Sequence, residues 1–131
     1  KISGPLMDRI DMQINLSRVE FSELKTKEKG ESSAAIRERV VKARLLQQER
    51  LEALGMHCNA QMGRSEVVKY CQLDAAAQNV MERYFNMLNL SARSHDRILK
   101  VARTIADLAG SESIEAVHLA EAIQLRTSVR P

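Results

Sequence analysis

Hydrophobic and polar residues alternate over one short stretch near the start of the chain. From Ile10 to Leu16 every second residue is apolar, and the residues between them are Asp11, Gln13 and Asn15. This period of two is typical of a half-buried β-strand. Because no later segment offers a convincing partner strand, we expect an orphan strand whose sheet lies upstream, and hence a sequence that is part of a longer protein.

A long amphipathic segment follows a polar stretch at residues 17–32. Its apolar positions predict a helix over about residues 33–54, which Gly55 ends. The apolar stripe is narrow, Gln47 interrupts it, and the remaining surface is rich in arginine, lysine and glutamate. We interpret this helix as an arm that lies across a surface rather than as an enclosed core helix. Its stripe consists of Ile36, Val40, Ala43, Leu51 and Leu54.

Four shorter helices are predicted after the long one. They cover about residues 65–72, the segment from an Asp74 cap to Asn89, the segment from a Ser91 cap to Ala109 before Gly110, and residues 115–126. The buried faces expected for the last three are Ala77, Val80, Met81, Tyr84 and Leu88; Ile98, Ala102, Ile105, Ala106 and Ala109; and Val117, Ala120 and Leu125. The predicted fold class is mainly α, a small helical bundle preceded by a long helix and an orphan strand.

Composition fits this interpretation. The chain has 131 residues, 44% of them hydrophobic and only 3% aromatic, so its core is built from aliphatic side chains that suit packed helices. A net charge of +3 permits an anionic partner without demonstrating one. Cys58 and Cys71 form no CxxC pair, which favours a reducing compartment. No apolar run approaches the roughly 20 residues that span a bilayer, so no membrane partner is expected.

Arg93 is the first candidate binding residue. With Ser91 as N-cap it takes the second helical position, where a positive charge is unfavourable by ~0.3–1 kcal/mol. The same helix end offers unpaired N–H groups to an anion. Arg97 and Lys100 follow on roughly the same face. Two interpretations stay open: a solvated basic face, or an arginine that faces a phosphate.

No metal site is predicted. The spacings of His57, Cys58, Cys71, His95 and His118 match no standard zinc pattern. Cys71 is expected in the core, His57 and Cys58 in a loop, and His118 on a helix surface. A Ser or Cys nucleophile with a His partner is equally unsupported.

Several segments together resemble a known family. These are GPLMDRIDM, GESSAAIRERV, NAQM, LSARSHDRILKVARTIADLAG and HLAEAIQLR, in that order along almost the whole chain. They are similar to the C-terminal end of the bacterial magnesium-chelatase-like AAA+ ATPases of the ComM/YifB type. The resemblance implies three parts: residues 1–20 end the AAA+ core with its arginine-finger segment and last strand, residues 21–62 are a linker and a long helix like the one inserted before sensor 2, and residues 63–131 form the helical lid.

The resemblance also implies roles for individual residues. Arg9 matches the arginine finger, which acts in trans on the γ-phosphate of a neighbouring subunit's ATP, and Asp8 and Asp11 would hold its side chain when ATP is absent. Without the resemblance, Arg9 reads as a surface salt-bridge residue. Arg93 matches the sensor-2 arginine, in cis or in trans, and Arg97 is a lesser nucleotide-binding candidate. No nucleic-acid-binding residue is assigned.

The function implied is that of a cytoplasmic, ring-forming homo-oligomeric ATPase that uses ATP and Mg²⁺. DNA is its expected partner, with branch migration in natural transformation and recombination as the activity. Insertion of magnesium into a tetrapyrrole and a stand-alone helical interaction module are the alternatives. The basic residues of the arm at residues 33–54 slightly favour DNA as the partner, although glutamates interrupt them. Because the chain contains no GxxxxGK[ST] motif, we expect no cofactor and no ATP hydrolysis in this sequence by itself.

Overall fold

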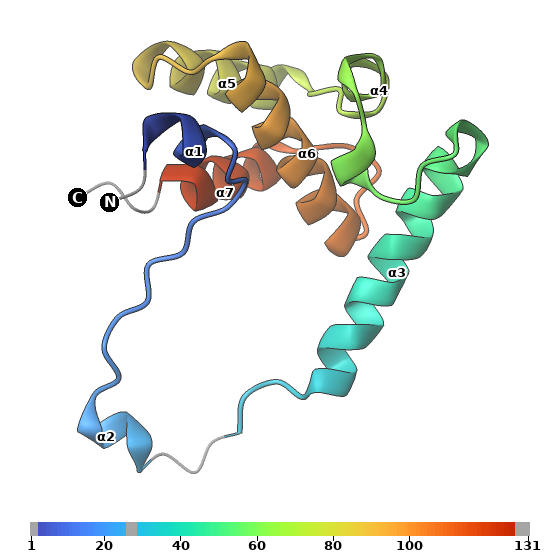
Figure 1. Cartoon of the computed structure of the whole chain (residues 1–131). Coiled ribbons are helices and arrows are strands. Elements are labelled where there is room, and N and C mark those ends of the chain that lie inside the picture. The colour runs from blue at the N-terminus through green and yellow to red at the C-terminus, as the bar shows by residue number, and fades with distance from the viewer. Residues whose placement is uncertain (1–2, 26–28, 128–131) are drawn as a thin grey trace.

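The computed structural model describes residues 3–25 and 29–127, and these residues form helices joined by loops (Figure 1). The predicted mainly-α fold class is confirmed. In chain order the helices are α1 (Gly4–Asp8), α2 (Phe21–Leu24), α3 (Ser33–Leu51), α4 (Arg64–Tyr70), α5 (Ala75–Met87), α6 (Ala92–Leu108) and α7 (Ala116–Thr127), with short 3-10 turns at Glu52–Leu54 and Asn59–Gln61.

Helix α6 is the centre of the bundle (Figure 1). It contacts α3, α4 and α7, and α5 packs on α7. The core between these helices is aliphatic, as the shortage of aromatic residues predicts. Its largest fully buried apolar side chains are Leu51, Met62, Met81, Ile98, Ile114, Leu119 and Val67.

The ends of α5 and α6 are set by local signals. The Asp74 carboxylate accepts a hydrogen bond from the Ala77 N–H, and the Ser91 hydroxyl accepts one from the Ser94 N–H, so both predicted N-caps are confirmed. Asn89 at φ 50° and Gly110 at φ 71° adopt the left-handed conformation that stops each helix. The expected buried faces of α5 and α6 are at least half-buried, except that Ala109 is exposed.

The predicted buried face of α7 is wrong at Val117 and Ala120, although Leu125 is half-buried as expected. Val117 and Ala120 are exposed, and the core contains His118, Leu119, Ala122 and Ile123 instead. The cause lies in the preceding loop, where Ile114 is fully buried and pairs with Leu73 as an isolated bridge, which sets the rotation of the helix that follows. His118 is therefore buried rather than on the surface, and its Nδ1 accepts the Glu115 N–H at 3.0 Å.

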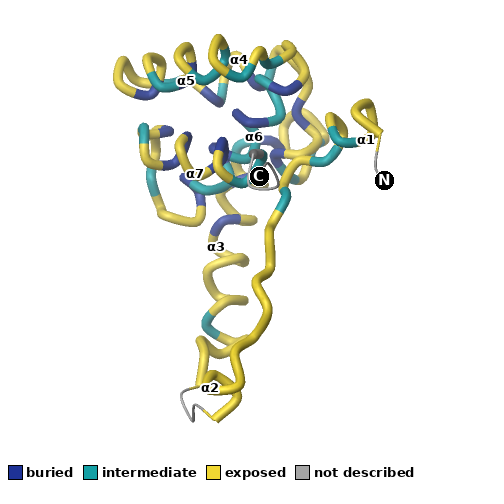
Figure 2. Tube along the Cα trace, turned by 90° about the vertical axis from the view of Figure 1, so that its left-hand side faces the viewer, coloured by how far each residue is buried: buried dark blue, intermediate teal, exposed yellow. Residues whose placement is uncertain are grey.

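Only the C-terminal part of α3 joins the bundle. Ala43, Gln47 and Leu51 are buried, whereas Ile36 and Val40 are each more than 40% exposed because the helix projects away from α6 (Figure 2). Leu54, also expected on the buried stripe, is exposed because the helix gives way to a 3-10 turn at Glu52–Leu54. Gln47 does not interrupt the packing, since its side-chain oxygen accepts the Asn59 N–H at 2.9 Å.

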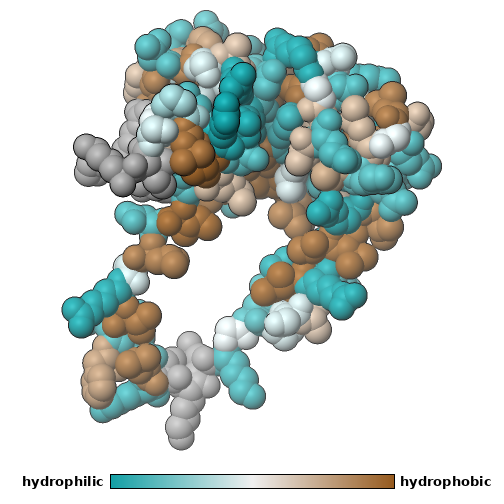
Figure 3. Space-filling model, viewed as in Figure 1, coloured by the Kyte–Doolittle hydropathy of each residue, from teal (hydrophilic) through white to brown (hydrophobic). Residues whose placement is uncertain are grey.

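The strand predicted at residues 10–16 is wrong. Residues 10–20 form neither helix nor strand in the part of the chain that the structure describes, and the unpredicted helix α1 precedes them. A strand needs the backbone of a neighbouring strand, and here the Gln13 N–H binds the Leu125 carbonyl at 2.6 Å instead. Residues 12–24 and α3 project from the bundle as two separate segments, and both carry exposed apolar side chains (Figures 1 and 3).

Candidate functional site

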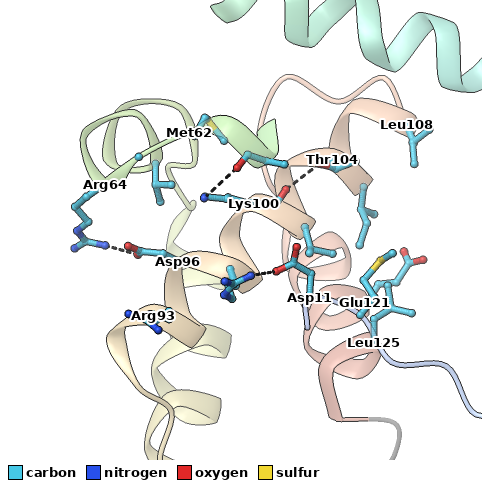
Figure 4. A pocket seen from close by; sticks show the side chains of 17 residues that line it. Asp11, Met62, Arg64, Arg93, Asp96, Lys100, Thr104, Leu108, Glu121 and Leu125 are labelled. Atoms are coloured by element: carbon cyan, nitrogen blue, oxygen red, sulfur yellow. Dashed lines mark hydrogen bonds and ion pairs between the residues drawn. The ribbon is translucent and has the colours of Figure 1, made fainter. Parts of the chain in front are cut away.

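One face of α6 lines an open groove of about 760 Å³ (Figure 4). Its other walls come from residues 60–67, from α7 and from Asp11 and Met12 of the N-terminal segment. Charged side chains gather toward the start of α6, and apolar ones toward its end. The charged residues at that end are Arg64, Arg93, Asp96, Arg97 and Lys100, the carboxylates Asp11 and Glu121 line other walls, and the apolar wall of α6 is Val101, Ile105 and Leu108.

Arg93 lies where the sequence predicts it, at the second position of α6. Its side chain is exposed and lines the groove. Among the described residues it forms no ion pair, which distinguishes it from Arg64, whose guanidinium pairs with Asp96. The arrangement combines a cation with the positive end of a 17-residue helix, and both favour an anion.

Arg97 and Lys100 share the groove with Arg93, but both are bound to groups of this chain. The Arg97 Nη1 donates to Asp11 Oδ1 at 2.7 Å, and its buried Nε has no partner within the described residues. The Lys100 ammonium reaches the Ala60 carbonyl at 3.5 Å. The structure therefore brings together the three cations that the sequence placed on one face, and leaves Arg93 as the most accessible to a ligand.

Arg9 lies outside this groove. It follows α1 as its C-terminal cap residue, and its side chain is exposed. The expectation that Asp8 and Asp11 hold Arg9 is wrong. Asp11 pairs with Arg97, and Asp8 lies 3.9 Å from an Arg126 nitrogen, so both carboxylates have their partners on α6 and α7.

Arg126, near the end of α7, is a residue that the sequence analysis missed. Its guanidinium donates to the carbonyls of Asp8 and Ile10 and to the Ser94 hydroxyl. Burial lowers the pKa of Arg126, and the nearby Asp8 carboxylate opposes this; an arginine with these acceptors stays charged. It is the last residue of the HLAEAIQLR segment, which was the only signal in the sequence.

A second missed group joins α3 to α6. Asp107 is almost fully buried and accepts hydrogen bonds from Arg50 and Arg103. Asn59 donates to the same carboxylate at 3.0 Å. The Arg103 guanidinium also donates to the Ser111 and Glu112 carbonyls, so this buried charge cluster is well supplied with partners. A carboxylate that lies four residues after an arginine on one helix was its sequence signal.

Neither a group of possible metal ligands nor a membrane-spanning helix is present in the described ranges 3–25 and 29–127. No three His, Cys, Asp or Glu side chains lie together in a way that would hold a metal ion. No helix in these ranges has the length and apolar character to cross a membrane. Cys71 is in the core as predicted, and burial raises the pKa of its thiol to about 11. His57 and Cys58 lie in the loop before α4.

The fold and the groove define a small helical domain whose central helix presents basic side chains, with Arg93 in its first turn forming no ion pair to any described residue. Residues 30–126 match the family described as magnesium chelatase, subunit ChlI C-terminal. The chain therefore belongs to this family, as a C-terminal region of the magnesium-chelatase-like AAA+ type.

Curated relatives agree with this assignment. Competence protein ComM of Haemophilus influenzae is 40% identical over 131 residues, which is 99% of this chain and 25% of the relative. YifB of Escherichia coli is 38% identical over 127 residues, and YifB of Salmonella typhimurium 37% over 127, each covering 96% of this chain and 24% of the relative. The resemblance to the ComM/YifB type is confirmed, and the chain spans about a quarter of these relatives' length.

Proposed function

We propose that this chain is the C-terminal lid and part of the subunit interface of a ring-forming, homo-oligomeric AAA+ ATPase in the bacterial cytoplasm. The observation that carries the proposal is Arg93, an exposed guanidinium in the groove at the start of α6 with no ion pair among the described residues. With the family membership, this supports Arg93 as the sensor-2 arginine that contacts the phosphates of ATP.

ATP, bound with Mg²⁺, would supply the phosphoryl group that is transferred to water. In this chain, Arg93 and the first turn of α6 would hold phosphate oxygens, because both offer positive charge at one place. Arg97 is the lesser candidate, since its guanidinium already binds Asp11. The sequence has no phosphate-binding loop, so the remaining nucleotide contacts would come from other parts of the longer ATPase.

Arg9 would act on a neighbouring subunit's nucleotide. Its side chain is exposed and is not among those lining this chain's own groove, which suits a group that reaches across an interface. Phosphoryl transfer spreads negative charge over the γ-phosphate oxygens, and a fixed guanidinium stabilises that charge.

We extend the proposal to the division of the chain. Residues 1–20 would end the ATPase core, residues 21–62 would form the linker and the long helix that precedes sensor 2, and residues 63–131 would form the lid. The exposed apolar side chains of Ile14, Leu16 and Val19 support a core surface next to the first part. The family match over residues 30–126 supports the remainder as the C-terminal region.

DNA is the partner that we propose for the whole ATPase. The relative from Haemophilus influenzae is named a competence protein, and we propose that the present protein moves DNA in the same setting, as a branch-migration helicase in natural transformation and recombination. The alternative is a motor for magnesium insertion into a tetrapyrrole, which the family's description favours.

The test is ATP turnover by the longer ATPase that contains this sequence. We expect turnover to rise when branched or single-stranded DNA is added and to stay constant when protoporphyrin is added. Stimulation by protoporphyrin but not by DNA would favour metal insertion. A longer protein that hydrolyses no ATP under any of these conditions would favour a stand-alone interaction module.

A further inference from the structure

The guanidinium of Arg126 holds the main chain on both sides of Arg9. Its Nη1 donates to the Ile10 carbonyl at 2.5 Å, and its Nη2 donates to the Asp8 carbonyl at 3.0 Å. These two acceptors belong to the residues directly before and after Arg9. One side chain from α7 therefore sets the backbone from which the Arg9 side chain leaves.

The same guanidinium also reaches the start of α6. Its Nη2 donates to the Ser94 hydroxyl at 3.1 Å, and Ser94 is the residue after Arg93. The Ser94 hydroxyl is also connected to the helix cap, since it accepts a hydrogen bond from the hydroxyl of the capping residue Ser91 at 3.1 Å. Arg126 thus contacts the immediate neighbours of both Arg9 and Arg93.

The environment makes this contact a rigid one. The Arg126 side chain is only 8% exposed, so water competes little for its hydrogen bonds. A planar guanidinium presents its donors in a fixed fork, and three acceptors on two separate segments fix its orientation. A lysine has the charge but not the fork, so it would hold fewer of these acceptors at once.

Two further contacts fasten the same segment to the lid. Asp11 accepts a hydrogen bond from Arg97 of α6 at 2.7 Å, and the Gln13 N–H donates to the Leu125 carbonyl of α7 at 2.6 Å. Residues 8–13 are therefore attached to both α6 and α7, and a movement of these helices moves the backbone that bears Arg9.

We propose that Arg126 is a positioning residue that couples Arg9 to Arg93. When the start of α6 shifts as Arg93 engages a phosphate, Arg126 passes that shift to the backbone at Arg9, which faces the neighbouring subunit. The inference rests on the proposed roles of Arg9 and Arg93, and Arg126 itself touches neither nucleotide nor reacting atoms.

The structural half of the proposal is tested on the 131-residue chain by hydrogen exchange of the Gln13 amide. Arg126→Ala is expected to speed this exchange about 10-fold or more, because hydrogen bonds from a charged donor hold the segment in place. Arg126→Lys is expected to have a smaller effect. Arg83→Gln, which removes an exposed arginine of α5, is the matched control and is expected to leave Gln13 exchange unchanged.

Core amides of α6, such as that of Ala102, report whether a variant is folded. If Arg126→Ala speeds core exchange as well, that variant is destabilised as a whole. Exchange of the Gln13 amide is then compared in the milder variants Arg126→Lys and Ser94→Ala, which keep the chain folded. Unchanged exchange of the Gln13 amide in the folded Arg126 variants would overturn the proposal.

The functional half is a double-mutant cycle on ATP turnover by the longer ATPase. Arg9→Ala and Arg126→Ala are each expected to lower kcat with little change in KM for ATP, and Arg126→Lys to recover part of the loss. If Arg126 acts through Arg9, the double variant is expected to turn over within about threefold of Arg9→Ala alone. A purely structural role for Arg126 would multiply the two losses.

The two failures are distinguishable. Normal turnover in Arg9→Ala would contradict the finger role of Arg9, and with it the coupling. A slow Arg9→Ala enzyme in which the Arg126→Ala loss is fully multiplicative would contradict the coupling alone.

Discussion

Arg50 and Asp107, 57 residues apart in sequence, face each other across α3 and α6 in a two-pronged ion pair with N–O distances of 2.7 and 3.1 Å. The Asp107 side chain is 1% exposed and that of Arg50 15%. Asn59 and Arg103 complete the ring of donors around the carboxylate. The long helix is therefore fixed to the bundle by a buried charge cluster as well as by apolar packing at Leu51.

Replacing Asp107 tests how much this cluster holds. Asp107→Asn is expected to lower the free energy of unfolding by about 3–5 kcal/mol, because it leaves the buried guanidinium of Arg103 and the largely buried one of Arg50 without a counter-charge. Urea unfolding of the chain measures the change. Glu38→Gln is the control, since its pair with Lys42 is exposed and is expected to contribute little. Equal stability of the two variants would show that the cluster is dispensable for the fold.

Arg93→Ala is expected to separate stability from activity. Removing a positive charge from the start of α6 should leave the chain equally stable, or more stable by up to ~0.5–1 kcal/mol. The same substitution should impair ATP hydrolysis by the longer ATPase. Ile98→Ala, at a fully buried position of the same helix, should instead cost the chain about 2–5 kcal/mol through cavity formation. Denaturant unfolding and ATPase kinetics supply both measurements, and an easily unfolded Arg93→Ala chain with normal ATPase would make Arg93 a structural residue.

Arg9→Ala in the longer ATPase is expected to leave ATP binding nearly intact and to reduce turnover sharply. A finger stabilises charge that develops only in the transition state, where such an arginine contributes roughly 10³–10⁵ in rate in GTPases. Nucleotide-binding titrations and steady-state kinetics test the two parts. Mixing this variant with subunits that lack the phosphate-binding lysine should restore some activity at mixed interfaces. Turnover within a few-fold of the unaltered enzyme would exclude the role.

Cys71 predicts how stability changes in alkaline solution. Burial raises the pKa of its thiol from 9.0 to about 11, so between these values the folded chain keeps a proton that the unfolded chain loses. Because the unfolded state then binds fewer protons, the free energy of unfolding should fall from pH 9 to pH 11, by about 2–3 kcal/mol in total. The difference between the unaltered chain and Cys71→Ala in urea unfolding isolates this effect from other titrating groups. Parallel pH profiles would contradict it.

Local signals in the sequence were sufficient for the central helices. Asp74, Ser91 and Gly110 determine where α5 and α6 begin and end through groups within a few residues of each other. The same signals placed Arg93 in the first turn of α6. These features were predictable because hydrogen-bonded caps and helical periodicity need no knowledge of the rest of the fold.

Features that depend on distant partners were not predictable in this way. The alternation at residues 10–16 describes which side chains are apolar, but not whether a second strand lies beside them. The contacts of Arg126 with Asp8 and Ile10 span 118 and 116 residues, and no local pattern reports them. The rotation of α7 likewise depends on Ile114, which is buried and forms an isolated backbone bridge with Leu73. The apolar pattern that includes Val117 and Ala120 gave no sign of this bridge.

The anchoring of α3 at one end makes the helix a lever. Its buried residues Ala43, Gln47 and Leu51 fix the C-terminal half to the bundle, and residues 33–42 project from it by about 15 Å at 1.5 Å per residue. A tilt of about 10° where α3 enters the bundle displaces the tip near Ser33 by roughly 3 Å. A small change in the tilt of α3 where it enters the bundle therefore becomes, at Ser33, a displacement large enough to make or break contact with another surface.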